Sequence, residues 1–228
     1  MRVLRGRAGT PAADRAATAD MVERTRESGT PGLRVWRPHR QVAFGRRDIH
    51  DEGYEHAREA AESAGFPAIE RSVGGRAVAY TGTTVAVALS KPAEDVRNGI
   101  AERYDDALHA IQRALWRLGV PAQQHEPEHA FCPGGHSLSW KGKIVGVAQR
   151  VRSDVALVGA VVVVDDHAAI ADVLQPVYAA LSIPFDPDTV GSIENADGRA
   201  APDTVVEEIE SVFLEIDGSS PEFEPVAT

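Results

Sequence analysis

The residues best suited to covalent chemistry lie together between positions 131 and 150. This stretch holds the only cysteine of the chain, Cys132, and two of its three lysines, Lys141 and Lys143. The thiolate is the nucleophilic form of cysteine, and cationic groups nearby make it accessible near neutral pH. A lysine ammonium is a compact donor that can bind a buried carbonyl or phosphate oxygen from one point. The stretch therefore indicates a thiol nucleophile with basic groups close by.

The sequence around the thiol predicts a loop. Cys132 is followed by Pro-Gly-Gly, whereas structural cysteines usually sit in apolar strands or helices. His136, four residues on, could act as a base toward the thiol. An inert small residue is the alternative interpretation of Cys132, and the loop setting counts against it.

Lys143 opens a predicted strand, Lys-Ile-Val-Gly-Val-Ala-Gln. Alternation along a strand would place Lys143, Val145 and Val147 on one face and Ile144 and Gly146 on the other. A lysine that shares a face with valines either extends past the strand end into water or points into a cleft. Both possibilities stay open from the sequence, while Lys141 is expected to be a turn residue before Gly142.

A second candidate binding motif is Arg-Ser-Val-Gly-Gly-Arg-Ala-Val, from Arg71 to Val78. Adjacent glycines let backbone amides approach a ligand closely, and the flanking arginines supply positive charge for a carboxyl or phosphate group. A tight turn that merely needs positive φ explains the same glycines. The motif fits neither the phosphate-loop nor the dinucleotide-binding pattern.

His125-Glu-Pro-Glu-His129 matches the spacing of the two-histidine zinc-protease motif. That motif works on a helix, where both imidazoles share one face. Pro127 removes a helical donor and clashes with the preceding turn, so the sequence predicts no metal site here.

Composition excludes several classes of function. The formal net charge of −10 argues against non-specific nucleic-acid binding, which needs a basic surface. The sequence shows no signal peptide and no apolar run of the roughly 18 residues that a membrane helix needs. A single cysteine cannot form an intramolecular disulfide, which suits a reducing compartment. We expect a soluble, cytoplasmic protein without a membrane or nucleic-acid partner; its oligomeric state is not predicted.

Hydrophobic periodicity and breaker residues predict a mixed α+β fold: a largely antiparallel sheet flanked by helices. The expected helices cover 11–26, 52–64, 93–118, 170–181 and 204–216. The expected strands cover 32–36, 41–45, 68–71, 77–80, 83–89, 137–140, 143–151 and 154–164. We expect one catalytic domain over residues 1–228, with a disordered acidic tail over about 217–228.

Four segments, taken in order, resemble the biotin/lipoate protein ligase and lipoyl/octanoyl transferase superfamily. The resemblance covers roughly residues 33–164 and implies the fold of that catalytic domain. The segments are Leu-Arg-Val-Trp-Arg at 33–37 with Val-Ala-Phe-Gly at 42–45, the motif at 71–78, Cys-Pro-Gly-Gly-His-Ser-Leu at 132–138, and Gly-Lys-Ile-Val-Gly-Val-Ala-Gln-Arg at 142–150.

Within this superfamily the chain is most similar to the cysteine-dependent octanoyl/lipoyl amidotransferases. Cys132 falls at their acyl-accepting nucleophile and Lys143 at their active-site lysine. The resemblance thus implies an acyltransferase that attaches an octanoyl or lipoyl group to a carrier-domain lysine through a Cys132 acyl-enzyme. Lys143 would lie near the carbonyl oxygen and stabilise its developing charge.

The same resemblance assigns the substrate site, partners and cofactors. The implied substrate-binding residues are Arg71, Gly74, Gly75, Arg76, Val78, Gly146 and His136, with Val145 and Val147 as further candidates for the wall of an acyl tunnel. The implied partners are lipoyl-carrier domains, namely the glycine cleavage H protein and the E2 subunits of 2-oxoacid dehydrogenases. No permanently bound cofactor is expected, because the lipoyl or octanoyl group is the substrate.

Two alternatives stay open. An ATP-dependent lipoate–protein ligase would form lipoyl-adenylate and use ATP and Mg. Such ligases have His-Asp after the glycine motif, where this chain has Tyr80-Thr81, and a later His-Gly, where it has Val158-Gly159. A non-catalytic acyl- or partner-binding module is the other alternative.

Overall fold

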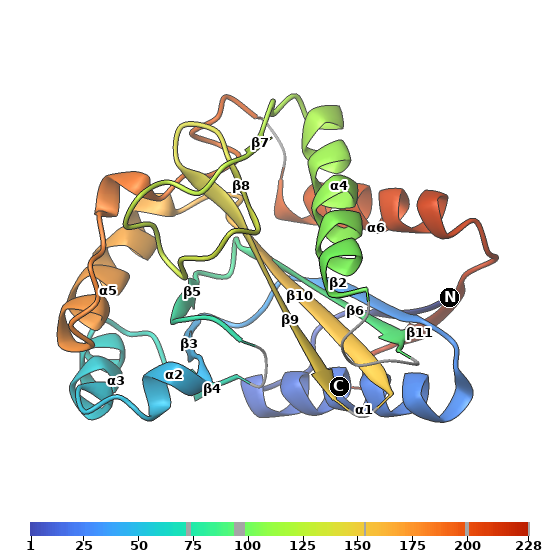
Figure 1. The fold of residues 1–228 in the computed structure, drawn as a ribbon, viewed down its shortest axis with the longest axis horizontal. Helices are drawn as coiled ribbons and strands as arrows, with labels where there is room; N and C mark the ends of the chain where they lie inside the picture. The colour runs from blue at the N-terminus through green and yellow to red at the C-terminus, as the bar shows by residue number, and fades with distance from the viewer. Residues whose placement is uncertain (72–73, 94–98, 153, 199–200, 228) are drawn as a thin grey trace.

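In the computed structural model, residues 1–71, 74–93, 99–152, 154–198 and 201–227 are described. Two sheets organise this part of the chain (Figure 1). The eight-stranded sheet has the order β11 (Glu222–Pro225), β1 (Arg2–Arg5), β2 (Gly32–Trp36), β6 (Val85–Pro92), β10 (Val155–Val162), β9 (Lys143–Arg152), β8 (Ser137–Ser139) and β7 (Gln123–Gln124). The three-stranded sheet has the order β4 (Ala68–Glu70), β3 (Gln41–Phe44) and β5 (Val78–Tyr80).

The helices cover these sheets in separate groups. They are α1 (Pro11–Ser28), α2 (Arg46–Ile49), α3 (Tyr54–Ser63), α4 (Ile100–Arg117), α5 (His167–Ala180) and α6 (Pro202–Asp217), with a single 3₁₀ turn, η1 (Pro187–Thr189). Helices α4 and α6 pack together over the large sheet, and α3 and α5 pack together beside the small one (Figure 1). Helix α1 packs on β2, β6 and β10.

Alternation along the central strands separates the two faces of the large sheet. Leu33 and Val35 of β2 join the core beneath α4 and α6, whereas Arg34 and Trp36 point to the α1 side. Arg34 is fully buried there, and its Nη2 lies 2.6 Å from Oδ1 of Asp14 in α1. The same guanidinium donates to the carbonyl of Gly6. This buried ion pair fixes α1 against the sheet, which matters because α1 forms one wall of the cavity described below.

The mixed, largely antiparallel α+β architecture predicted from the sequence is confirmed. In the large sheet, β2, β6, β10, β9, β8 and β7 pair antiparallel and the β11–β1–β2 edge is parallel. In the small sheet, β3 pairs in parallel with β4 and antiparallel with β5. The expected helix at 93–118 starts later, at Ile100 after Gly99 with φ 72°; residues 94–98 of that prediction lie outside the described part.

The prediction of a disordered tail over about 217–228 is wrong for residues 222–225. These residues form β11, which pairs in parallel with β1, a strand that the sequence did not reveal either. Each segment has only four residues, too few to show the sustained apolar alternation that marks a strand. β11 pairs with β1, and β1 pairs with β2 on its other side. Arg5 of β1 stacks over the ring of Phe223 at 3.8 Å, and Val226 beyond β11 is buried.

No helix in the described ranges is both long and apolar enough to span a membrane.

Candidate active site

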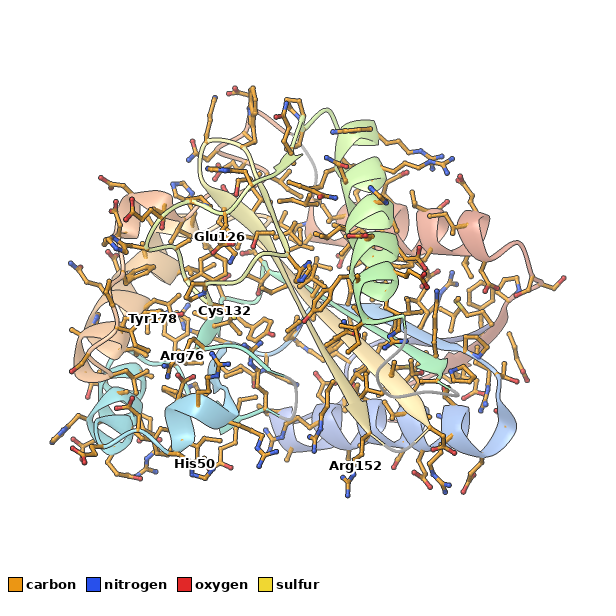
Figure 2. The ribbon with its side chains drawn as sticks, in the orientation of Figure 1. His50, Arg76, Glu126, Cys132, Arg152 and Tyr178 are labelled. Atoms are coloured by element: carbon orange, nitrogen blue, oxygen red, sulfur yellow. The ribbon has the colours of Figure 1, made fainter. Side chains whose placement is uncertain are left out.

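A cavity of about 930 Å³ runs between α1 and the two sheets. Its apolar wall comes from strand residues with small or branched side chains, among them Val78, Ala86, Ala88, Leu157 and Val161. Cys132 and Arg152 both line it, and Figure 2 shows these two side chains far apart. The cavity is therefore an elongated groove, open to a chain-like ligand.

The thiol of Cys132 lines this groove. Cys132 is half-buried and lies in the loop between β7 and β8, with φ 43° in the left-handed region. Its backbone N–H donates to the hydroxyl of Tyr178 in α5, which in turn donates to the carbonyl of Ala77 at 3.0 Å. Tyr178 thereby holds the strained backbone position of Cys132, and Figure 2 shows the two residues side by side.

Arg71, directly after β4, faces the sulfur. Its Nη2 lies 3.3 Å from Sγ of Cys132 and 2.6 Å from the carbonyl oxygen of Arg76. Burial lowers the pKa of Arg71, but Cys132 and Tyr80 act against it and raise the pKa above its ordinary value. Burial also raises the pKa of Tyr80 and of Tyr178, so both phenols stay neutral near pH 7.

Lys143 lies beneath the cysteine loop rather than in the groove wall. It is fully buried, and its Nζ donates to the carbonyls of Phe131 at 2.9 Å and Cys132 at 3.0 Å. The same nitrogen lies 3.0 Å from both carboxylate oxygens of Glu126. Lys143 therefore ties the cysteine loop to the sheet through the backbone carbonyls of the loop.

The expected alternation along 143–149 fails at its first residues. A register shift between Leu138 and Ser139 places Ser139 opposite Lys143 and Leu138 opposite Val145, so β9 has one extra residue there. Lys143, Ile144 and Val145 are all fully buried as a result. The bulge turns the side chain of Lys143 toward the cysteine loop. This differs from both placements predicted from the sequence, past the strand end into water or into a cleft.

Gly75 is the glycine of the motif that the site requires. Its φ is 93°, and a Cβ built on it would lie 2.5 Å from Sγ of Cys132 and 2.7 Å from Nη2 of Arg71. Gly45, after β3, meets the other side of the motif, because its Cβ would lie 1.9 Å from the carbonyl oxygen of Gly75. At Gly74 a Cβ would meet only one atom, at 3.9 Å. Ser72 and Val73 lie outside the described residues.

Arg76 supports the motif from behind. Its Nη1 lies 3.1 Å from Oδ1 of the fully buried Asp48, whose other oxygen accepts the N–H of Gly45 at 2.9 Å. Burial raises the pKa of Asp48, against the lowering effects of Gly45 and Arg76. Arg76 thus has a structural contact, and it is not among the residues that line the groove.

The other predicted site residues divide between groove and core. Val78, Gly146 and Val147 line the groove, whereas Val145 belongs to the core beneath α4 and α6. His136 also lines the groove, but its ring stacks on Tyr104 at 3.6 Å between centroids. No hydrogen bond joins His136 to the sulfur of Cys132 among the described contacts, so its role as a base stays a prediction.

Three residues of the site escaped the sequence analysis: Glu126, Tyr178 and Asp48. In the sequence Glu126 stands only as part of the histidine motif at 125–129, and the described residues contain no cluster of three potential metal ligands. Tyr178 looked like one more apolar position of a helix. Asp48 carried a usable signal, since it follows Gly45 at the spacing of a helix-capping residue. Lys141 is a turn residue, as predicted, with φ 51°.

Comparison with known proteins agrees with this geometry. The family model described as lipoyl protein ligase A/B catalytic domain matches residues 11–214. The octanoyl-[GcvH]:protein N-octanoyltransferase of Lysinibacillus sphaericus is 26% identical over 131 residues, covering 56% of this chain and 46% of that protein. The chain thus spans less than half the length of this curated relative.

Two solved structures share the fold along nearly the whole chain. A lipoate-protein ligase A bound with ATP superposes with a TM-score of 0.79 at 19% identity, covering 99% of this chain and 89% of its own. Ta0514 of T. acidophilum, described as a lipoate protein ligase with bound lipoic acid, gives 0.76 at 18% identity with the same coverage, 99% and 89%. At such identities these likenesses establish the fold alone.

Proposed function

Because the chain belongs to the lipoyl protein ligase A/B catalytic domain family, we propose that it acts in protein lipoylation, as an acyltransferase that uses Cys132 as covalent nucleophile. The acyl group is octanoyl or lipoyl, and the acceptor is the lysine of a lipoyl-carrier domain. One observation carries the proposal: the sulfur of Cys132 lines the elongated groove and lies 3.3 Å from a guanidinium nitrogen of Arg71.

The groove suits a linear acyl chain. Its volume of about 930 Å³ lies within the usual range for small-molecule sites, and its strand walls present Val78, Ala86, Ala88 and Leu157. Burial of each CH₂ contributes about 0.8 kcal/mol, so a seven-carbon tail gains about 6 kcal/mol in such a groove. That gain is enough to hold the chain while its carbonyl carbon faces the sulfur.

The reaction divides into two transfers. In the first, the thiolate of Cys132 attacks the carbonyl carbon of an acyl thioester or amide on a donor carrier, and a C–S bond forms. The bond from the carbonyl carbon to the donor sulfur or nitrogen breaks, and the leaving group takes up a proton. In the second, the uncharged ε-amine of the acceptor lysine attacks the thioester, loses a proton, and releases the thiolate of Cys132.

The comparisons support carrier proteins as partners. The curated relative is named for an octanoyl group on GcvH, and a structural analysis of an archaeal lipoylation system describes a bi-partite lipoate protein ligase of Thermoplasma acidophilum and its E2 lipoyl domain. We therefore propose the glycine cleavage H protein and E2 lipoyl domains as donor and acceptor. The proposed chemistry needs no permanently bound cofactor, because the carrier brings the acyl group already activated or as an amide.

The second candidate function is an ATP-dependent lipoate–protein ligase. It is favoured by the basic residues along the α1 end of the groove, which could bind phosphate groups: Arg15, Arg26, Arg150 and Arg152. Under this alternative, lipoate plus Mg-ATP replaces the acylated donor.

Intact-mass measurement separates these functions. The protein is incubated with an octanoylated carrier domain or, separately, with lipoate and Mg-ATP. The proposal predicts a covalent adduct of one octanoyl group with the first mixture, absent in Cys132→Ser. ATP-dependent modification of an apo-carrier that survives Cys132→Ser would support the ligase and overturn the proposal.

A control identifies the non-catalytic module. In one outcome, the unmodified protein and Cys132→Ser both bind octanoate while neither mixture gives an adduct or a modified carrier. That result would identify the protein as a non-catalytic acyl-binding module. Circular dichroism of Cys132→Ser should match that of the unmodified protein, since a slightly smaller hydroxyl replaces a thiol that is only half-buried.

A further inference from the structure

The cation that touches the sulfur of Cys132 is Arg71. The backbone N–H of Arg71 donates to the carbonyl of Phe44 at 2.9 Å, which fixes the start of its side chain at the end of β3. At the other end, Nη2 is held 2.6 Å from the carbonyl of Arg76 and reaches Sγ at 3.3 Å. The guanidinium is thus anchored on both sides of the contact.

The other charged groups around the sulfur are already engaged. Lys143 faces the carboxylate of Glu126 and donates to the carbonyls of residues 131 and 132 rather than to Sγ. Asp48 is paired with Arg76 on the far side of the glycine motif. His136 is stacked on Tyr104, and the phenols of Tyr80 and Tyr178 are neutral.

A second observation indicates that the guanidinium of Arg71 is paired with the thiol of Cys132. Nε of Arg71 is buried and has no hydrogen-bond partner within the described ranges, so Arg71 is not a fully bonded structural arginine. A buried cation without a carboxylate partner is costly unless another anion balances it. Two groups beside this guanidinium can become that anion: the phenol of Tyr80, whose pKa burial raises, and the sulfur of Cys132, 3.3 Å from Nη2.

We propose that Arg71 is a catalytic residue that holds Cys132 as thiolate, and that Lys143 is a positioning residue that shapes the cysteine loop. This inference rests on the proposed function. It makes Arg71 the cation at the reacting atoms, whereas the family resemblance implies that Lys143 lies at the reacting carbonyl. The thiol proton is released to solvent when the ion pair forms. Arg71 keeps its own proton throughout, as guanidinium groups in proteins do.

The test is the pH dependence of alkylation of Cys132 by iodoacetamide, which needs no carrier or acyl donor. Because the chain has one cysteine, the incorporated mass reports this residue alone. An opposite charge within about 4–6 Å favours the charged form of a titratable group. Arg71→Gln should therefore alkylate at least roughly tenfold more slowly at pH 7, and at the rate of the unmodified protein near pH 10.

Two variants provide controls. Arg71→Lys keeps the charge at the same site, so its alkylation profile should lie between those of Arg71→Gln and the unmodified protein. Arg37→Gln removes one positive charge from a surface pair with Asp203 and should leave the profile unchanged. Equal rates near pH 10 show that the thiol of Arg71→Gln is as accessible as in the unmodified protein, and circular dichroism of the variant shows whether it is folded.

The outcomes distinguish this inference from the proposed function. Superimposable pH profiles of Arg71→Gln and the unmodified protein would overturn the role of Arg71, even if an acyl adduct forms on Cys132. A shifted profile without any acyl adduct would uphold the ion pair and refute the acyl transfer. An equal shift of the alkylation profile in Arg37→Gln would also refute the role of Arg71, because the effect would then follow the net charge of the protein rather than the contact with Cys132.

Discussion

Replacement of Gly75 by alanine tests how closely the glycine motif approaches the nucleophile. The added Cβ would lie 2.5 Å from Sγ of Cys132 and 2.7 Å from Nη2 of Arg71, both ends of side chains that can shift. Ordinary contact needs 3.4–4 Å, so the sulfur or the Cβ must move by about 1 Å. Displacement of a reacting group by this distance costs on the order of 100-fold in rate.

The backbone contributes separately to the effect of this substitution. A left-handed φ costs an L-residue about 1–2 kcal/mol, and Gly75 has φ 93°. For a domain of this size, that loss lowers the melting temperature by roughly 2–8 °C. Gly82 is a matched control, because its φ is 95° and a Cβ there would meet no atom within 4 Å.

The expected outcome is therefore a pair of variants with similar melting temperatures and very different rates. Gly75→Ala should transfer an octanoyl group about 100 times more slowly than Gly82→Ala, measured by mass spectrometry of the acceptor carrier. Equal transfer rates of the two variants would show that the packing of Gly75 against Cys132 does not matter to the reaction, and would refute this reasoning.

Two further substitutions test the supports of the cysteine loop. Tyr178→Phe removes the acceptor of the Cys132 N–H, so it should lower the free energy of unfolding by roughly 1–3 kcal/mol, measured by urea denaturation. If the free energy of unfolding and the alkylation rate of Cys132 both stay unchanged, Tyr178 does not support the loop. Lys143→Met leaves Glu126 and two loop carbonyls without their cation, and should lower the melting temperature by on the order of 10 °C. An inactive Lys143→Met variant with an unchanged melting temperature would instead indicate direct contact of Lys143 with substrate.

The sequence predicted the elements of the fold well where apolar periodicity is strong. The strands around Val85 and Val155 and the helix that contains Ile111 carry that pattern, and they form the centre of the molecule. The β1–β11 edge could not be predicted in this way. Its strands have only four residues each, and the pairing of β11 with β1 joins segments more than two hundred residues apart.

The candidate site was predictable in its residue types but not in its connections. The loop sequence identified Cys132, and the glycine motif identified Arg71 and Gly75. The bulge in β9 turned Lys143 under the loop, and such a register shift depends on the pairing of two strands rather than on either sequence. Tyr178 joined the site because α5 packs beside β5, a tertiary contact that no local pattern records.

The central claim is that the acyl group passes through a thioester on Cys132. Its most direct test is a single-turnover chase: the octanoylated protein is isolated, mixed with an apo-carrier domain, and quenched at successive times for mass analysis. The account predicts that the adduct on Cys132 disappears at the rate at which octanoyl-lysine appears on the carrier, without ATP. An adduct that persists while the carrier is acylated, or a carrier acylated equally well by Cys132→Ser, would contradict it.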